Sequence, residues 1–151
     1  FAPNPPDGAE HVSVNTELIW TAGSGAAYHD IYLGSAGKPL TLLDSQSETI
    51  YTPGPLAHNT TYFWRIDEVN TAGRTPGSVW TFTTAPAGDF NLNGEVDIED
   101  IVFFISRWLY KCTRDDNWCD GADIDFSGHV DLGDLAALAS NWLFGVRDGI
   151  E

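Results

Sequence analysis

Basic residues are scarce in this chain. Its 151 residues include 7 Lys and Arg against 22 Asp and Glu, which gives a formal net charge of −15. Binding to a nucleic-acid backbone or to an anionic membrane surface depends on Lys and Arg side chains that neutralise phosphate charge. We therefore expect no nucleic-acid partner, and cations are the more suitable ligands.

Long apolar runs are also missing. No uninterrupted run of apolar residues exceeds five, as at 101–105, whereas a helix needs about 20 to cross a bilayer. The sequence therefore predicts no membrane insertion. The chain begins at Phe1 without the basic and apolar stretches of a signal peptide, so we interpret it as a mature product or as a piece of a longer protein.

Cysteine is limited to two residues, Cys112 and Cys119. A polar, acidic stretch separates them, and no His or further Cys lies at the spacing of zinc ligands. A local disulfide between them is the better interpretation. A cysteine pair in a loop favours an oxidising compartment, so we expect an extracellular or bacterial cell-surface location.

Signatures of catalysis are absent from the sequence. It has no nucleophile elbow, no phosphate-binding loop and no zinc signature. Carboxylates are plentiful, but those in the repeat described below are needed as metal ligands. We therefore expect no enzyme activity and no catalytic residue in this chain.

The charge is distributed unevenly along the chain. Residues 1–86 hold 8 acidic and 3 basic residues, and residues 87–151 hold 14 acidic and 4 basic residues. A stretch of small residues with Pro and Gly, residues 84–88, lies at this change in composition and is typical of a linker between folded units. The sequence therefore predicts two domains, 1–86 and 87–151.

The first domain has the pattern of an all-β fold. Turns with Pro and Gly separate seven segments of strand-forming residues, which predicts a seven-stranded sandwich. Within 62–67, Tyr62, Trp64 and Ile66 share one face of a strand, and Arg65 and Asp67 share the other, so we expect one buried and one solvated face. The seven segments are 11–14, 17–21, 28–33, 40–43, 49–52, 61–69 and 78–83.

The segment 56–84 resembles the second half of a fibronectin type III domain. Leu56 and Tyr62 match the tyrosine corner of that family, and Trp20 lies where the family has the core Trp of its second strand. The resemblance covers about residues 4 to 84 and implies a seven-stranded sandwich of two sheets. Such domains serve as spacers and as binding modules, so this fold alone does not specify a function.

The second domain contains an internal repeat. Residues 89–100 and 123–134 align at an offset of 34 residues, with oxygen-bearing side chains at loop positions 1, 3, 5, 9 and 12 and a glycine, Gly94 or Gly128, at position 6. This is the pattern of a calcium-binding loop, with Asp in place of the usual Glu at position 12.

Calcium requires such a pattern because it takes six to eight oxygen ligands, which alternate residues of a sharply turning loop can supply. We therefore expect two Ca²⁺ ions, one in each loop. The residues at position 7 would bind through their carbonyl oxygens, and those at position 12 through both carboxylate oxygens. The first set of ligands is Asp89, Asn91, Asn93, Glu95, Asp97 and Asp100, and the second is Asp123, Asp125, Ser127, His129, Asp131 and Asp134. Val96 and Val130 at position 8 would pair the two loops back to back.

A helix is predicted after each loop, because apolar residues recur there at steps of three and four. We expect these stripes to form the small core of the domain. The first stripe is Ile98, Ile101, Val102, Ile105, Trp108 and Leu109, and the second is Leu132, Leu135, Leu138, Trp142 and Leu143.

Two loop–helix units (F-hands), without the entering helix of an EF-hand, are similar to the dockerin domain over about residues 87 to 145. The resemblance implies binding to cohesin domains, which attaches secreted, often polysaccharide-degrading, proteins to a scaffold or a cell surface. Many dockerins have Ser or Thr at loop positions 10 and 11. Here these positions hold Ile98 and Glu99 in the first loop and Leu132 and Gly133 in the second.

These features predict a non-catalytic, extracellular, calcium-binding module for protein–protein attachment. Two versions remain open. The chain is the C-terminal appendage of a secreted polysaccharide-degrading enzyme that docks on a cohesin-like receptor, or it binds other copies of itself and forms an extracellular fibre. Carbohydrate binding through exposed aromatics such as Tyr28, Tyr32, Tyr51 or Phe63 ranks third.

Overall fold

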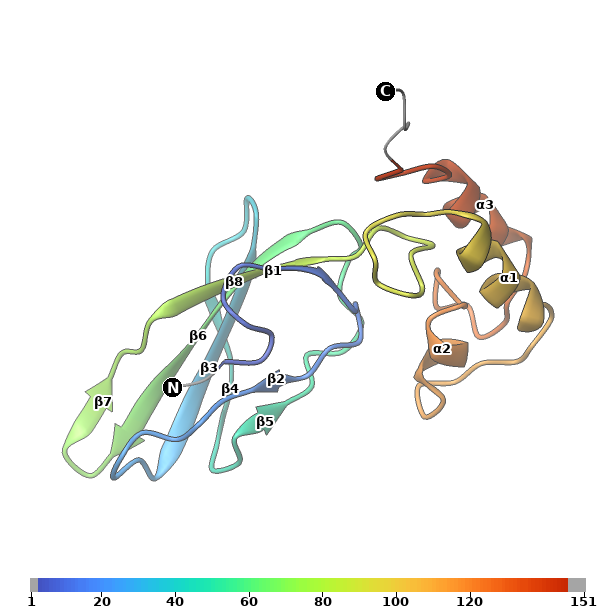
Figure 1. Ribbon diagram of the computed structural model, residues 1–151. Helices are drawn as coiled ribbons and strands as arrows, with labels where there is room; N and C mark the ends of the chain where they lie inside the picture. Colours follow the sequence, from blue (N-terminus) through green and yellow to red (C-terminus); the bar gives the residue numbers. More distant parts are fainter. Residues whose placement is uncertain (1–2, 147–151) are drawn as a thin grey trace, which may run out of the picture. The chain divides into compact units, whose positions relative to one another are not determined.

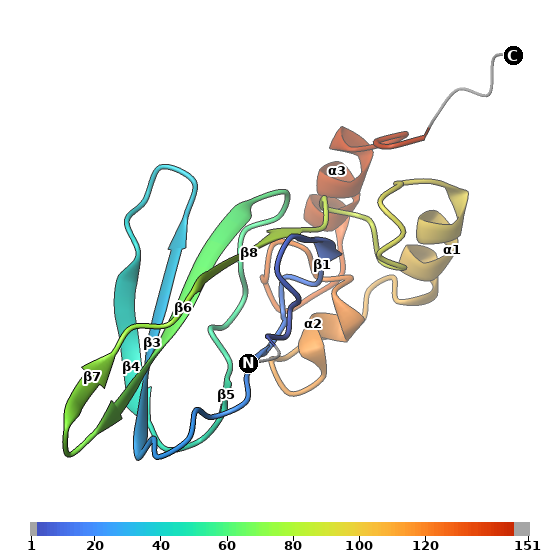
Figure 2. The same ribbon diagram turned by 60° about the vertical axis from the view of Figure 1, so that its left-hand side comes forward.

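The computed structural model describes residues 3–146. The chain divides into two compact units, residues 1–84 and 85–151, which we call the β unit and the α unit (Figures 1 and 2). This division lies two residues before the one predicted at residue 86, and residues 147–151 of the predicted second domain lie outside the described residues. Within residues 3–146, every helix is too short or too polar to cross a membrane.

Two sheets form the β unit. The larger sheet has the strand order β1-β8-β6-β3-β4, with β7 also paired to β6, and the smaller sheet pairs β2 with β5. Each of the seven predicted segments overlaps a strand, and the short strand β7 is an eighth that the sequence pattern did not indicate. The strands are β1 (Ala9–Val12), β2 (Leu18–Ile19), β3 (Tyr28–Ser35), β4 (Thr41–Gln46), β5 (Ile50–Tyr51), β6 (Thr61–Asn70), β7 (Gly73–Thr75) and β8 (Val79–Thr84).

Alternate residues of the central strands form the core of the β unit. Trp64 of β6 lies opposite Trp80 of β8 in the antiparallel register, and the centroids of their rings are 4.8 Å apart. Such aromatic cross-strand pairs stabilise a sheet because both rings leave water together. Trp20, expected in the core from the resemblance, is buried and lies edge-on to His29 at 5.5 Å.

The predicted tyrosine corner is present. The hydroxyl oxygen of Tyr62 accepts a hydrogen bond from the backbone N–H of Ala57 at 2.9 Å. Leu56 beside it is buried, and its N–H donates to the carbonyl of Val14 at 2.8 Å. This corner ties the start of β6 to the segment that precedes it.

The prediction of a solvated outer face on β6 is wrong for Asp67. Its side chain is only 1% exposed. The Nε atom of Arg65 lies 2.7 Å from one carboxylate oxygen of Asp67, and the backbone N–H of Gly77 donates to the same oxygen at 3.1 Å. Sequence alternation could not reveal this, because the groups that allow the carboxylate to be buried come from two different segments.

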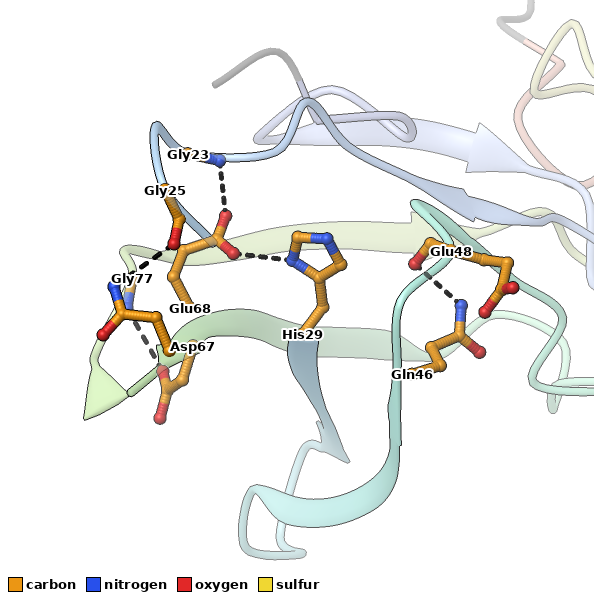
Figure 3. A network of polar contacts seen from close by, with 9 residues as sticks. Gly23, Gly25, His29, Gln46, Glu48, Asp67, Glu68 and Gly77 are labelled. Atoms are coloured by element: carbon orange, nitrogen blue, oxygen red, sulfur yellow. Dashed lines mark hydrogen bonds and ion pairs between the residues drawn. The ribbon is translucent and has the colours of Figure 1, made fainter. Parts of the chain in front are cut away.

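A second buried pair joins neighbouring strands on the other face of the sheet (Figure 3). His29 of β3 and Glu68 of β6 are cross-strand partners, with 2.6 Å between His29 Nδ1 and Glu68 Oε2. The other oxygen of Glu68 accepts the N–H of Gly23 at 2.8 Å. Both oxygens of Glu68 therefore have structural partners, and the pair fastens the segment after β2 to the large sheet.

Two nine-residue helices and one short turn form the α unit. The helices α1 (Ile98–Ser106) and α3 (Leu132–Ser140) follow the two acidic loops, and α2 (Asn117–Asp120) lies between them. The core of the α unit consists of residues from both halves of the unit, including the two cysteines of the disulfide. Its buried members are Val96, Phe104, Cys112, Cys119, Ala122, Ile124, Val130 and Leu138.

The prediction that the apolar stripes form this core is mostly wrong. Ile98, Val102 and Ile105 of α1 are 63–65% exposed, and Leu109 and Leu132 are 71% exposed. Leu138 of the second stripe is buried as predicted, and Ile101 and Trp108 of the first stripe pack against the core. The fully buried residue on α1 is Phe104, which lies outside the predicted stripe. A helix in so small a unit buries only a narrow stripe, so a second apolar stripe on the same helix faces solvent.

We expect the substitution Arg65→Ala to lower the free energy of unfolding of the β unit by about 3 kcal/mol, because it leaves the buried Asp67 carboxylate without its counter-charge. Lys38→Ala, at an exposed position, serves as the control and should change it by less than about 0.5 kcal/mol. Urea denaturation followed by circular dichroism measures both. Equal stability of the two variants would show that the Arg65–Asp67 pair contributes nothing.

Candidate metal centre

The two acidic loops have the same internal hydrogen bonds. We call residues 89–100 loop 1 and residues 123–134 loop 2. In loop 1 the carboxylate of Asp89 accepts the N–H of Gly94 at 2.9 Å, and in loop 2 the carboxylate of Asp123 accepts the N–H of Gly128 at 2.8 Å. Both glycines have a positive φ, of 90° and 95°. A glycine adopts this conformation without strain, which allows the loop to turn around the carboxylate.

The aspartates at loop position 12 close each loop. Asp100 accepts the N–H of Phe90 at 2.8 Å, and Asp134 accepts the N–H of Ile124 at 2.6 Å. The second oxygen of each accepts the N–H of the helix N-cap residue, Asp97 or Asp131. Since the N-cap side chains in turn accept a backbone N–H of the first helical turn, positions 9 and 12 together form a capping box.

Loop 2 brings three carboxylates to one point. Asp123, Asp125 and Asp134 each offer an oxygen, and these three oxygens lie within 4.8 Å of one another. Ligands around one Ca²⁺ ion, at about 2.3–2.6 Å from it, can be no more than about 5 Å apart. Asp123 and Asp134 are fully buried. This donor set therefore fits a hard cation.

The surroundings of Asp123 oppose the ionisation of its carboxyl group. Burial raises the pKa of the Asp123 carboxyl, hydrogen bonds from Gly128 and Ser127 lower it in part, and the charges of Asp134 and Asp125 raise it again. A cation placed among these oxygens would favour the charged form of all three carboxyl groups.

The remaining predicted ligands lie on the same two loops. In loop 1, Asn91 and Asn93 stand where loop 2 has Asp125 and Ser127, and their side-chain oxygens accept the N–H groups of Asn93 and Glu95. In loop 2 the hydroxyl of Ser127 donates to the carbonyl oxygen of His129 at 3.2 Å. These two predicted ligand atoms are therefore neighbours.

The expected back-to-back pairing of Val96 with Val130 is wrong. Val96 exchanges hydrogen bonds with the segment that follows α3: its carbonyl accepts the N–H of Leu143, and its N–H donates to Phe144, both at 2.9 Å. Val130 exchanges the equivalent bonds with Leu109 and Tyr110 after α1, also at 2.9 Å. Each loop is thus paired to the exit of the opposite helix. These contacts are formed between distant segments, which the spacing within one loop could not indicate.

The predicted disulfide between Cys112 and Cys119 is present. Between them lies a structure that sequence reasoning missed: all four residues of α2 have φ of +56° to +57°, a left-handed turn. Each L-residue in this conformation costs roughly 1–2 kcal/mol. The Asp116 carboxylate supports the turn by accepting the N–H groups of Cys119 at 2.9 Å and Thr113 at 3.0 Å, and these bonds lower the pKa of Asp116.

No family model and no curated protein matches the chain. Solved structures similar to it include two whose titles name FN3tt. The one titled "Crystal Structure of FN3tt" has 27% sequence identity and a TM-score of 0.43, and the similarity covers 50% of this chain and 84% of that chain. The one titled "Structure of FN3tt mut" has 28% identity and a TM-score of 0.37, covering 45% of this chain and 72% of that chain.

In the metal-free chain, we expect Asp123 to titrate above its ordinary pKa of 3.8 and Asp116 below it. The protonated form of Asp123 favours folding, so its contribution to stability is full below the unfolded pKa and is lost as the pH rises through the folded pKa. Asp116 acts in the opposite direction: its contribution is present above its unfolded pKa and is lost as the pH falls through the folded pKa. Carboxyl-carbon NMR during a pH titration measures both groups. An Asp123 that titrates below Asp116 would contradict burial as the dominant influence on the Asp123 carboxyl.

Proposed function

We propose that this chain is a non-catalytic, extracellular module that binds two Ca²⁺ ions and attaches its protein to a protein partner in a calcium-dependent way. The observation that carries the proposal is the duplicated loop–helix unit: both loops bury the aspartates at positions 1 and 12, three carboxylates converge in loop 2, and the helix after each loop exposes apolar side chains. The dockerin resemblance supports the same function. The β unit then acts as a spacer.

The donor chemistry supports a hard cation such as calcium over softer metals. The expected ligands are carboxylate, amide, hydroxyl and carbonyl oxygens, and the two cysteines, which could bind a softer metal, are joined in a disulfide. Hard cations such as Ca²⁺ prefer oxygen ligands. When bound, the ion supplies positive charge that offsets repulsion among the loop carboxylates, while the chain's own N–H groups orient the position-1 aspartates.

The exposed helix faces support attachment to a protein. Ile98, Val102 and Ile105 follow one another on α1 at steps of four and three residues and are all more than half exposed. On α3, Leu132 is exposed at the position equivalent to Ile98, and Leu143 after the helix is exposed as well. Exposed apolar patches on a small soluble unit mark interaction sites. Ile98 and Leu132 occupy loop position 10, so an apolar contact here replaces the hydroxyl groups of many dockerins.

Charge favours a separate receptor as the partner. Residues 87–151 contain 14 acidic and 4 basic residues, so two copies of this unit repel each other over the screening distance of the solution. A receptor with an apolar surface bordered by basic residues would complement it. We therefore favour the docking version, with a cohesin-like receptor, over a fibre made of identical copies.

Isothermal titration calorimetry should detect two Ca²⁺ ions per chain. Asp100→Asn should remove binding at loop 1 and Asp134→Asn at loop 2, because each takes charge and one acceptor from a closing carboxylate. Asp115→Asn, an exposed acidic position outside both loops, is the matched control and should keep both sites. Calcium binding that is absent in the unaltered chain, or equal in all three variants, would refute the metal sites.

Val102→Lys should weaken calcium-dependent binding of purified cohesin domains at least about tenfold, because it places a charge in the centre of the apolar face of α1. Thr113→Lys adds the same charge at an exposed position outside this face and should leave binding unchanged. Biolayer interferometry with immobilised chain, in Ca²⁺ and in EDTA, measures both.

Sedimentation velocity of the unaltered chain completes this test. We expect a monomer in Ca²⁺ at high concentration. If the chain associates with itself in Ca²⁺ and binds no cohesin, the result would support a self-assembling subunit and contradict the docking version. The absence of both association and cohesin binding would overturn the attachment function.

A further inference from the structure

The connector between the two halves of the α unit holds loop 2 from two sides. On the first side, residues after α1 run antiparallel to the second half of loop 2. The N–H of Leu109 donates to the carbonyl of Val130 at 2.9 Å, and the N–H of Cys112 donates to the carbonyl of Gly128 at 2.8 Å. This pairing fixes the glycine turn of the loop from outside.

On the second side, the left-handed turn of α2 leads directly into loop 2. The N–H of Asp123, the first predicted ligand, donates to the carbonyl of Trp118 at 3.1 Å. The ring of Trp118 also lies edge-on to that of Phe126 in loop 2, at 5.3 Å between centroids. The position of Asp123 therefore depends on the conformation of this turn.

The disulfide joins these two supports. Cys112 belongs to the segment paired with Gly128, and Cys119 belongs to the left-handed turn, with seven residues of separation between them. Four consecutive L-residues do not adopt this conformation by their own preference. The covalent bond is the strongest constraint that keeps the turn in place, and without it the turn can relax toward right-handed conformations.

Loop 1 has only part of this support. The segment after α3 pairs with Val96 as its counterpart pairs with Val130, but the N–H of Val146 donates to Leu143 and not to the glycine turn of loop 1. The chain has no other cysteine. Loop 1 is therefore not covalently fastened.

We propose that the Cys112–Cys119 disulfide is a redox latch that holds loop 2, and not loop 1, in its cation-binding shape, so that reduction of this bond lowers the calcium affinity of loop 2 alone. This inference rests on the proposed calcium binding. A dithiol reduces the bond by donating two electrons and two protons: the S–S bond breaks, two S–H bonds form, and the dithiol is oxidised to a disulfide.

A hollow of about 570 Å³ lies beside Cys119. Its lining includes Arg107, Lys111 and Cys119, so one of the two cysteines faces it although both are buried within the unit. Reduction would separate the two supports of loop 2 without removing any predicted calcium ligand.

The test compares calcium binding at each loop in the oxidised and the reduced full-length chain. The backbone N–H signals of Gly94 and Gly128 in NMR report on loops 1 and 2 separately, since each donates to the position-1 aspartate of its own loop. We expect dithiothreitol, or the double substitution Cys112→Ser and Cys119→Ser, to lower the calcium affinity of loop 2, measured from the Gly128 signal, at least about tenfold. This is the size expected when support around a metal site is removed. The calcium affinity of loop 1, measured from the Gly94 signal, should change by less than about twofold.

A third variant keeps the disulfide and weakens only the turn. Asp116→Ala removes the acceptor for the N–H groups of Cys119 and Thr113 and should also shift the Gly128 titration to higher calcium, with Gly94 unchanged. If the cysteine-free chain does not fold in saturating calcium, this variant decides the question. Asp115→Asn serves as its control.

An equal loss of calcium affinity at both loops would show that the disulfide stabilises the whole α unit and would overturn the latch. Unchanged calcium affinity at both loops would overturn it as well. Either result leaves the proposed function standing, because the oxidised chain still binds calcium. An oxidised chain without any calcium response at Gly94 and Gly128 would instead refute the proposed function itself.

Discussion

Two pairs of backbone hydrogen bonds, one at Val96 and one at Val130, connect each acidic loop to the segment that leaves the opposite helix. Both valines are fully buried at the centre of the core. Because of this exchange, neither loop–helix unit can close by itself, and the two halves of the α unit form one cooperative structure. The shape of each acidic loop therefore depends on residues more than ten positions away in the chain.

This pairing also explains why an apolar helix face points outward. The core is filled by one residue from each helix, Phe104 and Leu138, together with the two valines and the disulfide. The remaining apolar residues, such as Val102 and Ile105, find no room in so small a core. An unburied apolar face is costly for an isolated chain, and a protein partner that covers it removes that cost.

The β unit uses charge differently from the α unit. Its buried acidic groups have partners within the same unit, Arg65 for Asp67 and Arg74 for Asp30, and the partly buried Glu68 has His29. In loop 2 the buried Asp123 and Asp134 have only N–H donors and one another among the contacts of the described residues. The buried acidic groups of the β unit thus have basic partners within that unit, whereas the donor set of loop 2 leaves room for the cation that we propose.

Local sequence determined a large part of this structure. The spacing of Asp89, Gly94 and Asp100, repeated 34 residues later, defines the two loops and the start of each helix, because turn and capping interactions involve near neighbours in the chain. The alternation of β6 and the tyrosine corner are likewise local. Only the tertiary structure decided which apolar stripe of each helix is buried, how Val96 and Val130 pair, that Asp67 lies inside the β unit, and that a left-handed turn precedes Asp123. The first three depend on contacts between separate segments, such as Asp67 with Gly77, whereas the left-handed turn depends on the Cys112–Cys119 bond and on Asp116, which form no periodic pattern in the sequence.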